Sequence, residues 1–253
     1  MGAQKNERIL DIGAGKGEYA LSFSLVGADA VSIDSSLKSL HIAKKRSKHR
    51  LGLDLVLADA QNLPFKANVF DKALCCELLE HVQNDEKATG EIRFVLKRGG
   101  LCVFCVPNVD YPKVYDIINY VARKVGGKPL RIGLWSWGHY RLYSMGQILS
   151  LLRNSGFDVN RVRQVSHSLV AFYENGYVPY VIEYFIMPFL KRFGIATGGS
   201  DGSYSHFRYA FMSFFKRTYA RFLDFMCSLD ERVKNGNGVN IIVAAKKSGE
   251  SSI

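Results

Sequence analysis

The feature that most constrains the fold is a glycine-rich turn near the N-terminus, within Arg8–Tyr19, which reads RILDIGAGKGEY. A short apolar run ends there at Gly13, Gly15 and Gly17. Glycine suits such a turn because the chain bends tightly and a ligand must lie against bare backbone. The pattern predicts a buried strand, a tight turn and the start of a helix, as in a nucleotide-binding α/β sheet.

Acidic residues mark the ends of the apolar runs around this turn. Asp11 lies beside the glycines, and Asp34, Asp59 and Glu77 end three later runs. A carboxylate beside the turn would repel a pyrophosphate but suits a cationic ligand, and a strand-end carboxylate can accept both hydroxyls of a ribose. Any one of these residues could instead cap a helix. Four of them in order favour a ligand that contains a nucleoside.

These residues resemble the class I S-adenosylmethionine-dependent methyltransferases, whose first motif has the form [DE]-x-G-x-G-x-G. The resemblance covers roughly residues 8–165 and the last strand, and it includes an LEHV segment at Leu79–Val82. It implies an α/β, Rossmann-like sheet of seven strands whose last strand is antiparallel. It also implies S-adenosylmethionine as cofactor, bound by Asp11, Gly13, Ala14, Gly15, Gly17, Asp34, Ser35, Asp59, Ala60 and Glu77.

The chain is expected to divide into three parts. Residues 1–165 form the cofactor-binding core, and residues 236–253 form the final core strand and a flexible tail. Residues 166–235 stand where such a sheet needs only a short turn between strands six and seven. Two apolar segments there, Tyr177–Phe193 and Arg208–Lys234, predict a helical insertion. We expect a lid over an apolar acceptor pocket; an inert hairpin or a dimer contact is the alternative.

An aromatic loop, Trp135–Ser144, precedes a predicted helix over Met145–Asn154. In the resembled family a G-H-x-R-x-[YFW]-[ST] segment crosses the mouth of the active site at this point. His139 is therefore the candidate catalytic residue, because a histidine with a pKa near neutrality is the commonest general base. The alternative is a loop packed on the sheet edge, with His139 as a structural histidine.

The charge pattern bears on the partner. The formal net charge is +11, and most of the excess lies in residues 126–253, which favours an anionic substrate, nucleic acid or an anionic membrane surface. The N-P-P-Y motif of enzymes that methylate base or glutamine amines is missing after the fourth strand. We therefore expect a small or lipid-like acceptor that is methylated on oxygen or carbon. An RNA methyltransferase and a non-catalytic S-adenosylmethionine-binding module are the alternatives.

Cysteines and targeting signals add little to this interpretation. Cys102 and Cys105 have C-x-x-C spacing, but no second Cys or His pair follows at ligand spacing, so no metal site is expected. No apolar signal segment follows the polar first residues, which predicts a cytoplasmic protein. Basic residues interleaved with aromatics in the insertion add an expected peripheral contact with anionic membranes.

Overall fold

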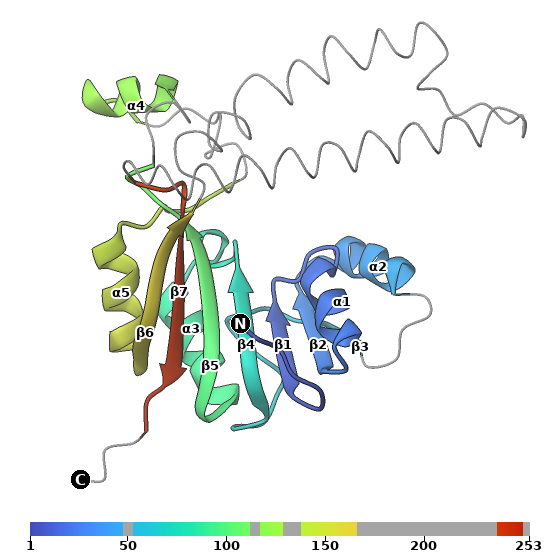
Figure 1. Ribbon diagram of the computed structural model, residues 1–253. Coiled ribbons are helices and arrows are strands. Elements are labelled where there is room, and N and C mark those ends of the chain that lie inside the picture. Colours follow the sequence, from blue (N-terminus) through green and yellow to red (C-terminus); the bar gives the residue numbers. More distant parts are fainter. Residues whose placement is uncertain (48–52, 112–116, 129–137, 166–236, 250–253) are drawn as a thin grey trace, which may run out of the picture. The chain divides into compact units, whose positions relative to one another are not determined.

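The computed structural model describes residues 1–47, 53–111, 117–128, 138–165 and 237–249 (Figure 1). The chain forms two compact units, and each is considered by itself. The first comprises Met1–Val109, Gly138–Gln164 and Asn240–Ile253. Residues 110–137, which the sequence analysis includes in the core, belong with the second unit. The predicted insertion over residues 166–235 lies outside the described residues.

The first unit is built on a seven-stranded sheet with the order β3-β2-β1-β4-β5-β7-β6. The strands are β1 (Arg8–Ile12), β2 (Asp29–Asp34), β3 (Leu53–Leu57), β4 (Phe70–Cys76), β5 (Leu96–Pro107), β6 (Phe157–Val165) and β7 (Asn240–Lys247). The first five strands pair in parallel, whereas β7 runs antiparallel to β5. The predicted α/β methyltransferase sheet with an antiparallel last strand is confirmed.

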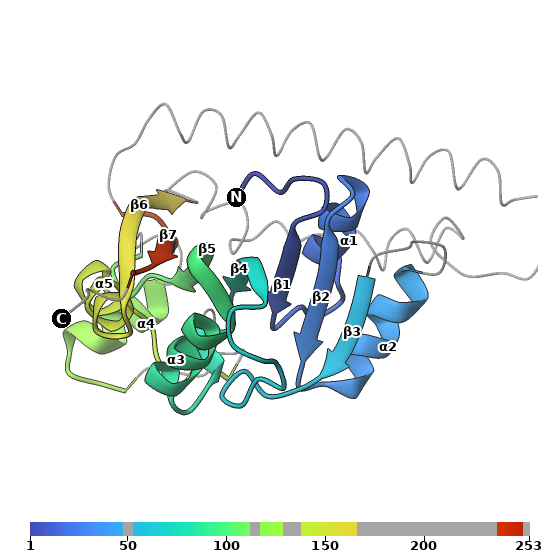
Figure 2. The same ribbon diagram turned by 90° about the horizontal axis from the view of Figure 1, so that it is seen from below.

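The described helices are α1 (Glu18–Leu25), α2 (Leu37–Arg46), α3 (Asp85–Val95), α4 (Ile117–Lys124) and α5 (Met145–Asn154), with a short 3₁₀ turn, η1 (Leu79–His81). Figure 2 shows α1 near β1 and β2, and α2 beside β3. Of these helices, α4 alone lies in the second unit. None of the described helices is both long enough and apolar enough to cross a bilayer.

Helix boundaries follow local capping where the sequence supplies it. Ser36 Oγ accepts a hydrogen bond from Ser39 N at 3.2 Å at the start of α2. Ser144 and Gln147 form a reciprocal capping box at the start of α5, as the predicted helix requires. The sequence predicts the third helix over Val82–Lys97, but this helix begins at Asp85, after the cap Asn84. The reason is a tertiary contact with Arg141, described below.

The core of this unit lies between the sheet and the helices α3 and α5. The strand β1 is buried from Ile9 to Ile12, as a near-continuous apolar run in a covered parallel sheet should be. The buried residues of α3 include Ile92 and Val95, and those of α5 are Ile148 and Leu152. This packing fixes the carboxyl ends of β1 and β4, between which the strand order reverses and where α/β folds bind ligands.

Candidate functional site

The glycine turn begins directly after β1. Gly13 and Gly17 have φ angles of 71° and 74°, a left-handed conformation that other residues rarely adopt. A Cβ on Gly13 would lie 2.9 Å from Leu78 Cδ1, and one on Gly17 would lie 2.9 Å from Ala43 Cβ. The turn therefore needs glycine both for its backbone angles and for close approach to its neighbours.

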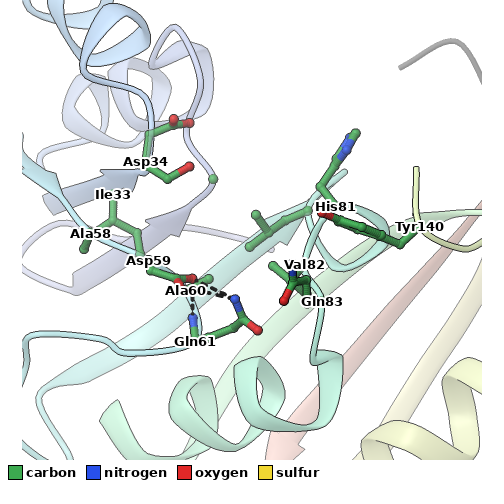
Figure 3. Close-up of a pocket in the computed structure, with 13 residues that line it drawn as sticks. Ile33, Asp34, Ala58, Asp59, Ala60, Gln61, His81, Val82, Gln83 and Tyr140 are labelled. Carbon is green, nitrogen blue, oxygen red and sulfur yellow. Dashed lines mark hydrogen bonds between the residues drawn. The ribbon is translucent and has the colours of Figure 1, made fainter. Parts of the chain in front are cut away.

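A pocket of about 430 Å³ opens where the strands end (Figure 3). Its lining comes from the ends of β1, β2 and β3, from the segment after β4 and from the loop before α5. The lining residues are Gly13, Ile33, Asp34, Ser35, Ala58, Asp59, Ala60, Gln61, Leu78, His81, Val82, Gln83 and Tyr140. Five predicted cofactor residues are thus brought together around one cavity: Gly13, Asp34, Ser35, Asp59 and Ala60.

Asp34 is held in place by backbone N–H groups of the glycine turn and of the segment that follows β2. Its Oδ2 accepts a hydrogen bond from Gly15 N at 2.8 Å, and its Oδ1 accepts one from Ser36 N at 2.7 Å. Each carboxylate oxygen has a second lone pair. Asp34 can therefore join the glycine turn to β2 and still accept hydrogen bonds from a ligand.

Asp59 is fixed in a similar way. Its Oδ1 accepts a hydrogen bond from Gln61 N at 2.9 Å, and the Gln61 amide nitrogen lies 3.3 and 3.2 Å from its two oxygens (Figure 3). The Gln61 amide oxygen accepts in turn from Asn84 N at 3.0 Å. Gln61 thus connects the end of β3 to the start of α3, a role that its sequence position does not indicate.

The other predicted cofactor residues do not line this pocket: Asp11, Ala14, Gly15, Gly17 and Glu77. Asp11 is only 2% exposed, and its Oδ2 has no hydrogen-bond partner among the described residues. Burial, with a smaller effect of the Asp34 charge, raises the pKa of Asp11 to about 7, against the lowering effect of a backbone hydrogen bond at Ala20. Glu77 is exposed, has a φ of 51° and accepts a hydrogen bond from the Cys105 thiol at 3.3 Å.

A second cluster of polar side chains lies at the mouth of the pocket. The rings of His81 and His139 meet edge to face, with their centroids 4.6 Å apart. Burial, together with the neighbouring His81, lowers the pKa of His139 to about 4. Glu80 is fully buried, and this burial, reinforced by the Glu77 charge, raises its pKa to about 9. The structure thus places the predicted catalytic His139 beside two ionisable residues of η1.

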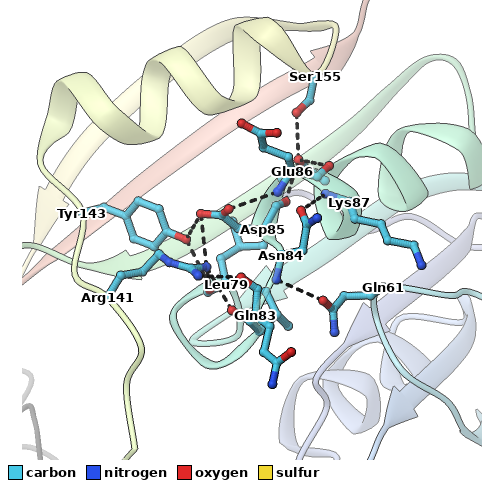
Figure 4. A network of polar contacts seen from close by, with 12 residues as sticks. Gln61, Leu79, Gln83, Asn84, Asp85, Glu86, Lys87, Arg141, Tyr143 and Ser155 are labelled. Atoms are coloured by element: carbon cyan, nitrogen blue, oxygen red, sulfur yellow. Dashed lines mark hydrogen bonds and ion pairs between the residues drawn. The ribbon is translucent and has the colours of Figure 1, made fainter.

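Arg141 and Tyr143 fix the loop that carries His139 (Figure 4). The Arg141 guanidinium donates to the carbonyl oxygens of Val82 and Gln83 at 2.9 and 2.7 Å. It also pairs with Asp85 Oδ2 at 3.3 Å, and the same oxygen accepts the Tyr143 hydroxyl at 2.7 Å. The carbonyls that a helix over these residues would use are therefore bound to Arg141, which explains why α3 begins late.

A sequence profile described as "Methyltransferase domain" matches residues 10–104. These residues are a methyltransferase domain. They contain the glycine turn, Asp34, Asp59 and the η1 segment, so the match covers most of the pocket. Together with the sheet order, it places this domain in class I of the S-adenosylmethionine-dependent methyltransferases, as the sequence analysis predicts.

Curated relatives extend the likeness. The chain is 36% identical over 103 residues to demethylmenaquinone methyltransferase of Renibacterium salmoninarum, covering 41% of this chain and 42% of that protein. It is 32% identical over 155 residues to ubiquinone biosynthesis O-methyltransferase of Roseobacter denitrificans, covering 61% of each. The alignments thus span less than two thirds of these relatives.

A solved structure shares the fold of the methyltransferase domain. Phosphoethanolamine N-methyltransferase 2 of Haemonchus contortus, solved with S-adenosyl-L-methionine, aligns with a TM-score of 0.60 at 20% identity. The alignment covers 97% of this chain and 50% of the other. At this identity the likeness establishes the fold alone.

Proposed function

We propose that this chain transfers a methyl group from S-adenosylmethionine to a small or lipid-like acceptor, on oxygen or carbon. The observation that supports the proposal is the pocket, whose lining includes Asp34, Asp59 and His81. His139 is not part of the lining, but its ring meets that of His81. The names of the two curated relatives, which refer to menaquinone and ubiquinone, support an apolar acceptor of this kind.

The residues around the pocket fit the cofactor. Gly13 lines the pocket and has no side chain, so its backbone can lie against a ligand. We assign the ribose hydroxyls to Asp34 and Ser35, and the adenine to Asp59 and the backbone of Ala60. Gly15 and Gly17 shape the turn, as does Ala14, whose N–H donates to Ile33 O at 2.9 Å.

The methionine end of the cofactor is assigned to the other two acidic residues. Asp11 has a buried oxygen without a partner among the described residues, which suits the cofactor's ammonium group. Glu77 follows β4 on the same edge of the sheet. When bound, S-adenosylmethionine supplies an electrophilic methyl on a sulfonium. The protein's part is then to align that methyl with the acceptor atom and to keep water out.

His139 is proposed to contact the acceptor and take its proton. A pKa of about 4 keeps the imidazole neutral at pH 7, so it is free to accept a proton. The same low pKa makes it a weak base. We therefore expect His139→Ala to lower kcat by about 10²-fold, the lower end of the range for general bases, with cofactor affinity unchanged. A loss of only a few-fold would return His139 to a structural role.

The cofactor assignment is tested by calorimetry with S-adenosylmethionine. Asp34→Ala should weaken binding by about 1.5–3 kcal/mol, the scale of a charge-assisted hydrogen bond. Asp54→Ala is the matched control, because Asp54 is an exposed aspartate of β3 that does not line the pocket. Unchanged affinity in a folded Asp34→Ala protein would refute the assignment.

The acceptor class is tested with a labelled methyl donor. The full chain is incubated separately with isolated quinol lipids, with a small-molecule extract and with RNA. We expect label in the lipid or small-molecule fraction, and none when Asp34→Ala replaces the wild type. Label confined to RNA would overturn the proposed acceptor, and label in no fraction would favour the non-catalytic binding module.

A further inference from the structure

Glu80, His81 and His139 form a compact group of metal-ligating side chains. One ligand atom from each, a carboxylate oxygen and two imidazole nitrogens, lies within 4.8 Å of the other two. Two of these residues belong to η1, and the third lies on the loop that Arg141 holds against it. The group is therefore built by two segments that hydrogen bonds already fix relative to each other.

The cluster holds buried polar atoms that nothing in the described structure satisfies. Glu80 is 0% exposed, and neither of its carboxyl oxygens has a partner with hydrogen-bond geometry among the described residues; its close neighbour is the Glu77 carboxyl, whose charge helps to raise the pKa of Glu80. The same holds for the buried Nδ1 of His139. Leaving a buried polar group unpaired costs about 1–3 kcal/mol, and more for a charged group. Three such atoms on two residues of one cluster point to a ligand that would pair with them.

We propose that Glu80, His81 and His139 bind a divalent transition-metal ion at the mouth of the cofactor pocket. Two imidazoles and one carboxylate are ligands that suit Zn²⁺ and Fe²⁺, and catalytic sites of this kind keep a coordination position open. Ligand atoms about 2.0–2.2 Å from a tetrahedral metal ion are about 3.3–3.6 Å apart. The three ligand atoms here lie within 4.8 Å of one another, so binding would draw them closer together.

The surroundings of His81 fit a ligand role. A hydrogen bond with the Gly138 backbone acts on its imidazole and partly offsets the effect of burial, which lowers its pKa. Metal-binding histidines almost always use their second nitrogen in this way, which fixes the ring and its tautomer. With an ion bound, His139 would act on the acceptor as a metal ligand instead of as the base assigned to it under the proposed function. The sequence-based prediction of no metal site would then be wrong.

A neighbouring group, Cys76, Glu77 and Cys105, also brings three ligand atoms within 4.8 Å of one another. Its atoms are already engaged, because Cys105 Sγ donates to Glu77 Oε1 at 3.3 Å and Cys76 Sγ lies 3.8 Å from the Tyr19 hydroxyl. The histidine cluster is the better site.

The position of the proposed metal site suggests that the ion acts on the acceptor. This part of the inference rests on the proposed function. His81 and Tyr140 both line the pocket, so an ion on His81 would lie beside the acceptor. A bound metal lowers the pKa of a coordinated oxygen acid. An acceptor with two adjacent oxygens, such as a catechol or a hydroxyquinone, could bind the ion through both and release a proton to solvent. Its oxyanion would then take the methyl group from the sulfonium and leave S-adenosylhomocysteine.

Cobalt is the probe, because its visible absorption reports both binding and ligand type. The full chain is stripped with a chelator and titrated with Co²⁺. We expect one ion per chain, with d–d bands of a nitrogen and oxygen site, and displacement by Zn²⁺. Glu80→Gln, His81→Ala and His139→Ala should each weaken Co²⁺ binding at least about 10-fold, a loss that even outer-shell changes produce. His41→Ala, at an exposed histidine of α2, should bind Co²⁺ as the wild type does.

Several results would overturn the proposal. One is no Co²⁺ binding by the wild type, a measurement that needs no variant to fold. Another is an intense sulfur-to-cobalt band that Cys76→Ala abolishes, which would place the ion on the cysteine group. A third is equal weakening by His41→Ala. Calorimetry with S-adenosylmethionine separates this test from that of the proposed function: Asp34→Ala should lose the cofactor and keep Co²⁺, whereas His139→Ala should do the reverse.

Discussion

Two regions along one edge of the sheet differ in whether their polar side chains have hydrogen-bond partners. On the cofactor side, Asp34 and Asp59 already accept hydrogen bonds from the loops that follow their strands. On the proposed acceptor side, Glu80 is buried and His139 is half-buried, and each has buried polar atoms that have no partner among the described residues. The first region is paired without a ligand, whereas the second has the unpaired atoms from which we propose a metal site. Asp11 is the exception on the cofactor side.

The largest expected effect is the change in stability on replacing Asp11, the exception on the cofactor side. The pKa of Asp11 is raised from 3.8 to about 7, so its contribution to stability is present below pH 3.8 and is lost as the pH rises towards 7. Asp11→Asn removes the buried charge. It should raise the free energy of unfolding at pH 8 by up to about 4 kcal/mol, at 1.36 kcal/mol per pKa unit, and leave it unchanged below pH 4. Urea unfolding at pH 3.5, 5 and 8 measures the difference.

Asp71→Asn is the control of opposite sign. Although burial works against it, hydrogen bonds from Lys97 and from Arg8 N lower the pKa of Asp71. Its contribution is therefore present above pH 3.8 and is lost as the pH falls, so Asp71→Asn should destabilise the protein at pH 8. If both variants changed the free energy of unfolding in the same direction at pH 8, Asp11 would not differ from the other aspartates on the cofactor side. The contrast between the two regions would then hold without an exception.

The next largest effect is expected from replacing Arg141, which holds the loop that carries His139. Arg141→Lys keeps the charge but cannot reach Val82 O, Gln83 O and Asp85 with one planar group. We expect a loss of about 2–3 kcal/mol in the free energy of unfolding, the scale of hydrogen bonds to a charged group. Arg153→Lys, at an exposed position of α5, should change it little. Equal losses in the two variants would show that the loop does not depend on Arg141.

The smallest expected effect comes from removing the hydroxyl of Tyr143 while keeping its ring. Tyr143 is 3% exposed, and its hydroxyl lies 2.7 Å from Asp85 Oδ2 and 3.2 Å from Leu79 O. Tyr143→Phe keeps the packing and should cost about 1 kcal/mol of unfolding free energy. Tyr140→Phe, at a tyrosine that is 59% exposed, is the comparison and should cost less. A larger loss in Tyr140→Phe would mean that the loop is held through Tyr140 instead.

The sequence predicted the elements whose signals are local. Buried parallel strands such as β1 are continuous apolar runs, and Ser144 and Gln147 form the capping box that begins α5. Parallel strands also bring their carboxyl ends to one edge, which is why Asp34 and Asp59 could be assigned to one pocket before its geometry was known. The antiparallel last strand came from the family resemblance.

What could not be predicted depends on contacts through space. His81 and His139 lie far apart in the chain, and neither position shows that their rings meet. The start of α3 was placed too early because propensity does not reveal that Arg141 takes the carbonyls of Val82 and Gln83. Gln61 was missed for a similar reason, since its role depends on Asn84. The predicted lid over residues 166–235 lies outside the described residues and stays a prediction.

The place of β7 in the sheet has a consequence for the order in which the protein is made. β7 (Asn240–Lys247) lies between β5 and β6, so both are hydrogen-bonded to a strand that the ribosome adds much later. At about 5–20 residues per second, the chain between β5 and β7 takes on the order of 10 s to synthesise. Over that time the long edge of β5 has no neighbour on this side, and unpaired edges invite other chains. Nascent-chain chaperones would therefore act on this protein chiefly at β5.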